Sequence, residues 1–293
     1  MMFELNQTVL NESLKRWLEE DIGMGDVTTM TTIPSDSMSK GIIHVKDNGI
    51  VAGLPVAKAV FALVDPQLRF EAKASDGDAV SKGTVIAEVS GSTRSILLGE
   101  RLALNLLQRM SGIATRTNQF VERLEGRPSR LVDTRKTTPG HRMLEKYAVR
   151  VGGGHNHRFG LYDAVMIKDN HIKGAGGIAK AIQSARARIP HTMKIEVEVE
   201  NFVQLNEALG AEPDIIMLDN MGLEQMREAV LFIKQRAPHI IVEASGNVSL
   251  DNVREIAETG VDVISVGRLT YSVQSLDISL DLNEQKGKKE DRA

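Results

Sequence analysis

The chain has 293 residues, of which 42% are hydrophobic and 26% are charged, a composition typical of a folded globular protein. Its formal net charge of −3 argues against general nucleic-acid binding, which requires a basic surface. The sequence has no cysteine, which excludes disulfides and cysteine–zinc sites, and no run of 18 apolar residues that would span a membrane. The first residues also lack the pattern of a secretory signal, so we expect a cytoplasmic protein.

The first predicted element is an amphipathic helix. Apolar residues recur at helical spacing at Leu10, Leu14, Trp17, Leu18 and Ile22. Asn11 is the candidate cap at the start of this helix, and Gly23 and Gly25 end it.

Short β-like runs follow between residues 41 and 91, separated by glycine and aspartate. The turn-rich segment 76–83 resembles a connection of biotinyl and lipoyl carrier domains, but no lysine occupies the attachment position, which favours a structural role. A long helix is predicted from Ser95 to about Glu125, with a buried apolar stripe and a possible bend at Ser111-Gly112. This helix links an α+β domain to the rest of the chain.

From Leu131 onward, apolar strands alternate with helical segments. The predicted strands are LVDT, AVMI, KIEVEV, IIML, IIVEA and VISVG, and the predicted helices are 178–189, 202–209, 223–236 and 250–259. This alternation indicates a parallel sheet, and the spacing favours a β/α barrel over a doubly wound open sheet. We expect the polar residues 283–293 to be frayed.

Positive charge is concentrated in one segment of this acidic protein. Between Arg135 and Lys173 there are eight Lys/Arg residues against three acids, together with four of the seven histidines. Such a segment suggests a pocket for a polyanionic small molecule, with a solvated basic surface as the alternative.

All six predicted strands end in polar, charged or glycine residues, as expected for one composite site at the carboxyl ends of barrel strands. The fixed cations at these ends are Arg135, Lys136, Arg158 and Lys168, which are suited to grip carboxylates or phosphates. His155 and His157 offer hydrogen bonds, although a structural role is equally compatible with either. A zinc site on these two is disfavoured, because no third ligand lies nearby in the sequence.

Two further groups complete the predicted site. Ser245-Gly246-Asn247 and Gly267-Arg268 end consecutive strands where barrels often bind phosphate. Glu198 and Asp219 are suited to coordinate Mg²⁺, to bind sugar hydroxyls or to stabilise positive charge. We expect Glu196 to pair with a lysine beneath the site.

Several of these motifs resemble the quinolinate phosphoribosyltransferase family. They are Asp133-Thr134-Arg135-Lys136-Thr137-Thr138-Pro139-Gly140, Gly152-Gly153-Gly154-His155-Asn156-His157-Arg158 and Lys168-Asp169-Asn170-His171. The likeness continues through the ends of the later strands and through Glu20–Thr29, so it covers nearly the whole chain.

The resemblance implies an incomplete, open β/α barrel over residues 113–270 and an amino-terminal α/β sandwich domain over residues 1–112, joined by residues 271–293. It further implies a homo-oligomer, a dimer or an assembly of dimers, in which Arg101 of one subunit completes the pocket of its neighbour. The implied activity converts quinolinate and phosphoribosyl pyrophosphate (PRPP) to nicotinate mononucleotide, pyrophosphate and CO₂, in NAD biosynthesis.

Residue roles follow from the same resemblance. Quinolinate would be bound by Arg101, Arg135, His157, Arg158 and Lys168. PRPP would be bound by Lys136, Glu198, Asp219, Ser245, Gly246, Asn247 and Gly267. Catalysis is assigned to Lys136, Lys168, Glu198 and Asp219, and the cofactor is Mg²⁺, held by the two acids directly or through water.

Three alternatives remain at this point. The first is a transferase of the same fold that acts on nicotinate or another aromatic acid without decarboxylation. The second is a barrel lyase or aldolase in which Lys168 forms a Schiff base with a phosphorylated sugar. The third is a non-enzymatic carrier or binding module, as the segment 76–83 would suggest.

Overall fold

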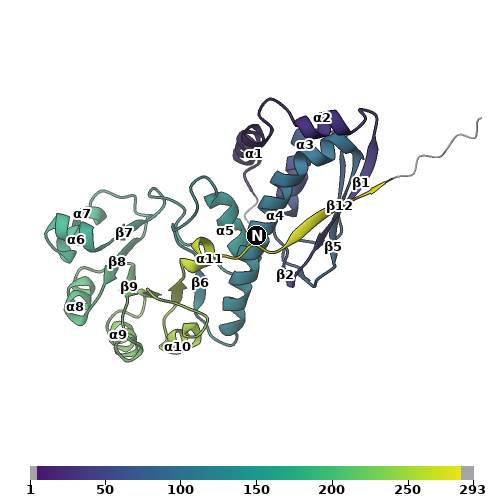
Figure 1. Cartoon of the computed structure of the whole chain (residues 1–293). Coiled ribbons are helices and arrows are strands. Elements are labelled where there is room, and N and C mark those ends of the chain that lie inside the picture. The colour runs from purple at the N-terminus through teal and green to yellow at the C-terminus, as the bar shows by residue number, and fades with distance from the viewer. Residues whose placement is uncertain (1–4, 285–293) are drawn as a thin grey trace, which may run out of the picture. The chain divides into compact units, whose positions relative to one another are not determined.

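The structure, a computed structural model, describes residues 5–284 and shows a chain that divides into two compact units (Figure 1). The first unit comprises Met1–Arg116, Pro139–Gly153 and Ser272–Ala293, and the second comprises Thr117–Thr138 and Gly154–Tyr271. Segment 139–153, which the predicted division at residue 112 placed in the barrel domain, packs within the first unit. There His141 stacks on Trp17 with ring centres 4.6 Å apart, a contact between residues distant in sequence.

The first unit is built on an antiparallel sheet with the strand order β12-β1-β5-β3. Its strands are β1 (Met38–Val45), β3 (Arg69–Ala72), β5 (Val85–Ser92) and β12 (Ile278–Glu284), and a separate pair is formed by β2 (Gly49–Ile50) and β4 (Ala79–Val80). Every second residue of β1 is buried, so one face of this sheet covers the core. Asn283 and Glu284, expected to be frayed, pair with β1 through the backbone, whereas residues 285–293 lie outside the described part.

Helices complete the first unit: α1 (Gln7–Ile22), α2 (Val27–Thr32), α3 (Leu54–Val64) and α5 (Arg142–Val151). The α1 helix begins one turn earlier than predicted, because the side chain of Asn6, and not that of Asn11, accepts the Val9 N–H. The turn at 76–83 has a structural role. The carboxylate of Asp76 accepts the backbone N–H groups of Gly53 and Leu54 at 2.8 and 3.0 Å, and so caps α3.

The long α4 helix (Thr93–Arg123) has 31 residues and lies within two residues of its predicted limits. Its first 24 residues belong to the first unit and its last seven to the second (93–116 and 117–123). The helix continues through Ser111, whose hydroxyl is buried and donates to the carbonyl of Ala52.

The second unit contains six parallel strands, as predicted. They are β6 (Arg130–Val132), β7 (Val165–Ile167), β8 (Ile195–Val199), β9 (Ile215–Asp219), β10 (Ile241–Ser245) and β11 (Val263–Ser265). The order β6-β11-β10-β9-β8-β7 follows the chain and brings the first strand beside the last, as in a barrel. A doubly wound sheet would instead reverse its order at a switch point. The unit is therefore an open β/α barrel whose edges are β6 and β7.

Helices connect these strands: α6 (Asp169–Ala175), α7 (Ile178–Arg186), α8 (Phe202–Gly210), α9 (Leu223–Arg236), α10 (Val253–Ala257) and α11 (Arg268–Tyr271). The predicted limits of α9 are matched, whereas α7 and α10 are shorter than predicted. The strands β8, β9 and β10 are almost continuously buried, as expected for a parallel sheet covered by helices. Within residues 5–284, no helix combines the length and the apolar character needed to cross a membrane.

Candidate active site

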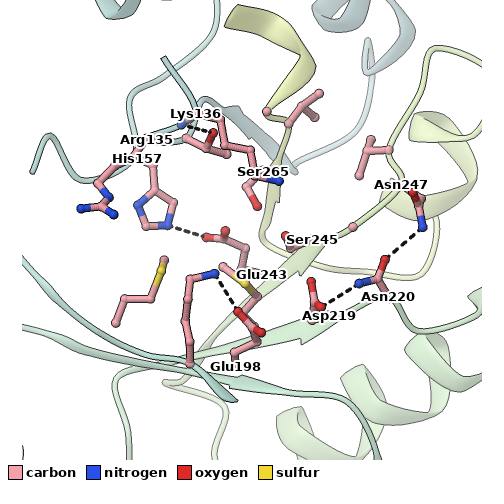
Figure 2. A pocket seen from close by; sticks show the side chains of 18 of the residues that line it. Arg135, Lys136, His157, Glu198, Asp219, Asn220, Glu243, Ser245, Asn247 and Ser265 are labelled. Carbon is pink, nitrogen blue, oxygen red and sulfur yellow. Dashed lines mark hydrogen bonds and ion pairs between the residues drawn. The ribbon is translucent and has the colours of Figure 1, made fainter. Parts of the chain in front are cut away.

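A cavity of about 560 Å³ opens at the carboxyl ends of the barrel strands (Figure 2). This volume is in the range of small-molecule sites. All residues that line it belong to the second unit. Its polar and charged side chains are Thr134, Arg135, Lys136, His157, Arg158, Lys168, Glu198, Asp219, Asn220, Glu243, Ser245, Asn247, Ser265, Arg268 and Tyr271.

Four cations predicted from the sequence converge on this cavity. Arg135 and Lys136 follow β6, Arg158 lies in the loop before β7, and Lys168 follows β7 directly. Burial and the neighbouring charge of Arg135 lower the pKa of Arg158 from its ordinary value, which shows that like charges are held together here. Such an arrangement is stable only opposite a bound anion or fixed acids.

The loop that carries two of the predicted ligands is fixed by Asp133. This fully buried carboxylate accepts the Asn156 amide at 2.7 Å and the backbone N–H of His157 at 2.9 Å. These bonds direct His157 and Arg158 into the cavity. His155 instead forms backbone bonds beside β6 and is not one of the lining residues.

His157 lies over two buried carboxylates at the floor of the cavity. Its Nε2 atom is 3.2 Å from Glu196 Oε2 and 3.4 Å from Glu243 Oε2. The predicted lysine partner of Glu196 is therefore wrong, because the imidazole from the 154–158 loop occupies that place. Burial alone would lower the pKa of His157, but the two carboxylates outweigh it and raise this pKa to about 10.

The ring of His157 is held in this place by a contact on each of its two nitrogens. The backbone N–H of Arg158 contacts His157 Nδ1 at 2.7 Å, so Nε2 is the ring nitrogen that faces the two carboxylates. Burial raises the pKa of Glu196 from its ordinary value, whereas the hydrogen bond from His157 opposes this shift.

A second pair of charges lies beside this cluster. Lys168 Nζ is 2.8 Å from Glu198 Oε2, and Glu198 is largely buried whereas Lys168 is about half exposed. Asp219 ends the neighbouring strand β9 and accepts the Asn220 amide at 2.7 Å through Oδ2. The two acids predicted for the site therefore line the same cavity from adjacent strands.

The opposite side of the cavity is formed by the ends of β10 and β11. Ser245, Gly246 and Asn247 form a turn after β10, and Gly267 follows β11. A Cβ atom at Gly267 would lie 3.0 Å from Cδ of Lys136, so glycine leaves room for this lysine. Exposed backbone N–H groups in such turns are suited to phosphate oxygens.

Eleven of the twelve predicted site residues line the cavity, and the exception is Arg101. Arg101 lies on α4 in the first unit, where its side chain is 60% exposed. Three other cations of the basic segment, Arg142, Lys146 and Arg150, belong to α5 in the first unit.

Five further polar residues line the cavity, and the sequence argument gave them no role: Thr134, Asn220, Glu243, Ser265 and Tyr271. Glu243 had a detectable signal, since a lone carboxylate inside the apolar run IIVEA is costly unless it serves a site. Arg268 lines the cavity together with Gly267, the strand end singled out from the sequence, whereas Tyr271 lies on the short α11 helix and gave no signal.

The fold and the cavity define an enzyme of the α/β-barrel class that binds polyanionic small molecules. Two family models match the chain: the quinolinate phosphoribosyl transferase N-terminal domain over residues 26–111 and the C-terminal domain over residues 113–281. The chain therefore belongs to the quinolinate phosphoribosyltransferase family.

Individual relatives agree with this assignment. The chain is 48% identical to a probable nicotinate-nucleotide pyrophosphorylase (carboxylating) from Synechocystis sp., over 94% of this chain and 92% of the relative. It is 46% identical to a protein of the same name from Bacillus subtilis, over 95% of each chain.

Solved structures show the same relationship. NadC from Streptococcus pyogenes matches with a TM-score of 0.91 and 43% identity, over 96% of this chain and 98% of that chain. Human nicotinic acid phosphoribosyltransferase matches with a TM-score of 0.61 and 12% identity, over 96% of this chain and 74% of that chain. The second match concerns the fold alone.

Proposed function

We propose that this chain is a decarboxylating quinolinate phosphoribosyltransferase of NAD biosynthesis. It transfers the phosphoribosyl group of PRPP to the ring nitrogen of quinolinate, and it releases pyrophosphate and CO₂ to give nicotinate mononucleotide. One observation carries this proposal: three cations suited to two carboxylates, Arg135, Arg158 and Lys168, converge on one side of a cavity with phosphate-binding turns on the other.

Quinolinate recognition is assigned to the cationic side. Arg135 and Arg158 have planar guanidinium groups that bind carboxylates through two parallel hydrogen bonds. Lys168 adds a point charge that is already oriented by Glu198. His157 contributes differently from the direct contact expected from the resemblance, because both of its ring nitrogens are engaged within the protein, and we assign it to holding the Arg158 backbone in place.

PRPP recognition is assigned to the opposite side. The turn Ser245–Asn247 and Gly267 would bind the 5-phosphate through backbone N–H groups and short polar side chains. Glu198 and Asp219 would face the ribose hydroxyls, and Lys136 would lie near the pyrophosphate. The Lys136 ammonium is 5.9 Å from the centre of the Tyr271 ring, which limits where this flexible side chain can point.

The donor set of the cavity fits Mg²⁺. Glu198 and Asp219 supply carboxylate oxygens from adjacent strands, and these are the ligands that this hard cation prefers. We propose that these two residues hold Mg²⁺ directly or through water. When bound, Mg²⁺ would neutralise charge on the leaving pyrophosphate.

The chemistry follows from this arrangement. The bond between ribose C1 and the pyrophosphate oxygen breaks, and the carboxylates of Glu198 and Asp219 stabilise the positive charge that develops on C1. The quinolinate nitrogen then bonds to C1, which makes the ring cationic. The adjacent C2 carboxylate leaves as CO₂, its electron pair stays on C2, and C2 takes up a proton.

The test is a single incubation with quinolinate, PRPP and Mg²⁺. We expect nicotinate mononucleotide and CO₂ in equal amounts, and we expect no product when EDTA replaces Mg²⁺. Replacing quinolinate by nicotinate separates this proposal from the non-decarboxylating alternative. Faster turnover of nicotinate than of quinolinate would overturn the proposed substrate.

We further propose a homodimer, or an assembly of dimers, in which Arg101 reaches the pocket of the neighbouring subunit. Support comes from the first unit, where Val27 and Met30 of α2 expose apolar side chains. Arg94 on α4 donates to the carbonyls of Met30 and Ile33, so α2 lies against this face of α4. Arg101 lies seven residues further along α4, on the same face.

Subunit complementation tests this arrangement. Arg101→Ala and Arg135→Ala should each have little activity at quinolinate concentrations near the wild-type KM, because each removes one quinolinate contact from every site. A mixture of the two variants, after dissociation and reassociation, should regain activity, since a mixed dimer contains one intact site. A mixture as inactive as its parts would contradict the shared pocket.

A cytoplasmic location is also proposed. PRPP carries several negative charges and does not cross a membrane unaided, so the enzyme must act in the compartment where PRPP is made. Fractionation of the producing cell should recover the activity with the cytosolic enzymes.

A further inference from the structure

Two neighbouring strand ends of the cavity adopt an unusual backbone conformation. Asn220 follows β9 with φ of 53°, and Gly246 and Asn247 follow β10 with φ of 96° and 49°. Within residues 5–284, only one other residue with a side chain has a positive φ, namely Glu212 at 54°. This left-handed conformation is unfavourable for residues with a side chain and persists where the surroundings enforce it.

Hydrogen bonds connect these two strand ends through the side chain of Asn220. Its amide Nδ2 donates to Asp219 Oδ2 at 2.7 Å, and its Oδ1 accepts from Asn247 Nδ2 at 3.1 Å (Figure 2). The backbone N–H of Asn220 donates to the carbonyl of Ser245 at 3.0 Å. Position 220 therefore requires a short side chain that carries both a hydrogen-bond donor and a hydrogen-bond acceptor.

The turn after β10 packs directly against this amide. A Cβ atom at Gly246 would lie 2.3 Å from Asn220 Oδ1 and 3.0 Å from the Asn220 backbone nitrogen, so the contact requires glycine. On the other side of the turn, Asn252 Nδ2 donates to the carbonyl of Asn247 at 3.0 Å. The turn is therefore held from both sides.

This arrangement has a consequence for Asp219. Asn220 occupies Oδ2, whereas Asp219 Oδ1 has no partner among the described residues and lines the cavity. One carboxylate oxygen is thus fixed by the protein and the other is directed toward a ligand. The same amide sets the distance between that oxygen and the turn at 245–247.

We propose that Asn220 is a positioning residue for PRPP. Its side chain holds the ribose-facing carboxylate of Asp219 and the phosphate-binding turn at 245–247 at a fixed distance from each other. The inference rests on the proposed function, in which these two groups bind the ribose and the 5-phosphate of one substrate. Preorganisation of both contacts lowers the cost of binding a flexible phosphorylated sugar. Asn220 has no part in binding quinolinate.

Kinetics of glycine variants test the proposal, because glycine adopts a positive φ without strain. Asn220→Gly and Asn247→Gly should each raise the KM for PRPP about tenfold, the effect of losing roughly one hydrogen bond. The KM for quinolinate should change less than about twofold. The double variant should have a KM for PRPP no higher than that of either single variant, because each single variant already breaks the hydrogen bonds that connect Asp219 to Asn247.

Two further variants separate positioning from general damage. Glu212→Gly relaxes the other positive φ, at an exposed residue outside the cavity, and should leave both KM values unchanged. Asn220→Asp keeps the acceptor for Asn247 but places a carboxylate beside Asp219, so it should be at least as impaired as Asn220→Gly.

The outcomes are distinguishable. If the wild-type protein makes no nicotinate mononucleotide, the proposed function itself is wrong. If the wild type is active and Asn220→Gly keeps the wild-type KM for PRPP, the positioning role is wrong. An equal rise in both KM values, or additive effects in the double variant, would overturn it as well.

Discussion

His157 Nε2 lies 3.2 Å from Oε2 of Glu196, a carboxylate that is almost completely buried beneath the cationic side of the cavity. The second carboxylate, Glu243, approaches the same nitrogen from the next strand but one. Each of these acids also has an Oε1 atom that is buried without a hydrogen-bond partner among the described residues. The imidazole of His157, together with the nearby charge of Arg158, therefore offsets the cost of burying these carboxylates in the barrel floor.

This cluster predicts that the free energy of unfolding falls as the pH rises from 6.5 toward 10. The pKa of His157 is about 10 in the folded protein, against 6.5 in the unfolded chain. The folded state therefore holds a proton that the unfolded state has released in this window. By linkage, the stabilisation is complete below pH 6.5 and is lost as the pH rises through the folded pKa. Urea unfolding at a series of pH values measures this slope.

The control for this prediction is the double variant Glu196→Gln/Glu243→Gln. It keeps the shape of the floor and removes both charges, so the slope in the same window should become shallower. A slope equal to that of the wild type would show that the proton is held elsewhere.

Arg135→Ala should raise the KM for quinolinate by roughly 10- to 100-fold, the effect of losing charge-assisted hydrogen bonds to a carboxylate. Arg135→Lys should have an intermediate KM for quinolinate, because lysine keeps the positive charge but cannot form the two parallel hydrogen bonds of a guanidinium group. Steady-state kinetics with PRPP at saturation measure both variants. The matched control is Arg227→Ala, which removes an exposed arginine paired with Glu224 on α9. Unchanged kinetics for Arg135→Ala would overturn its role.

Lys168 should form no Schiff base during turnover. Its Nζ atom is engaged with Glu198 Oε2 at 2.8 Å, and the chemistry proposed for this cavity needs no amine nucleophile. Borohydride added during turnover should leave the mass of the protein unchanged and should cause no loss of activity. A stable adduct on Lys168 would favour the lyase alternative.

Local patterns explain why the barrel could be predicted. The strand β8 is an apolar run in which Glu196 and Glu198 alternate with buried valines, and β10 is a similar run that ends at Ser245. Because parallel strands of a barrel place their carboxyl ends together, polar residues at these ends predict a site without further information. The cations of this site were found in the same way.

The remaining features depend on contacts between residues distant in sequence. The helix α5 lies between two barrel segments in the chain, yet His141 before it stacks on Trp17. The partner of Glu196 is a histidine about 40 residues earlier, placed by the buried Asp133. No periodicity within one element reports such pairings. The role of Asn220 was missed for a related reason, since it depends on a backbone conformation shared by two loops.

The last prediction concerns the space that Gly267 leaves for Lys136. In Gly267→Ala the new Cβ atom would lie 2.9 Å from Cε1 of Tyr271 and 3.0 Å from Cδ of Lys136. The backbone at Gly267 has no positive φ, so alanine is compatible with its conformation. Both clashing groups are the outer parts of side chains, which can move without disturbing the strands. We therefore expect little change in thermal unfolding.

Activity should nevertheless fall, because Lys136 would leave the position from which it meets the pyrophosphate. A misplacement of about 1 Å near the reacting centre can reduce turnover roughly 100-fold. We expect kcat/KM for PRPP to fall 10- to 100-fold. Gly210→Ala is the matched control, since a Cβ atom at the end of α8 meets no atom within 4 Å. Wild-type kinetics for Gly267→Ala, with the fold intact, would show that the placement of Lys136 against Tyr271 is not required for pyrophosphate release.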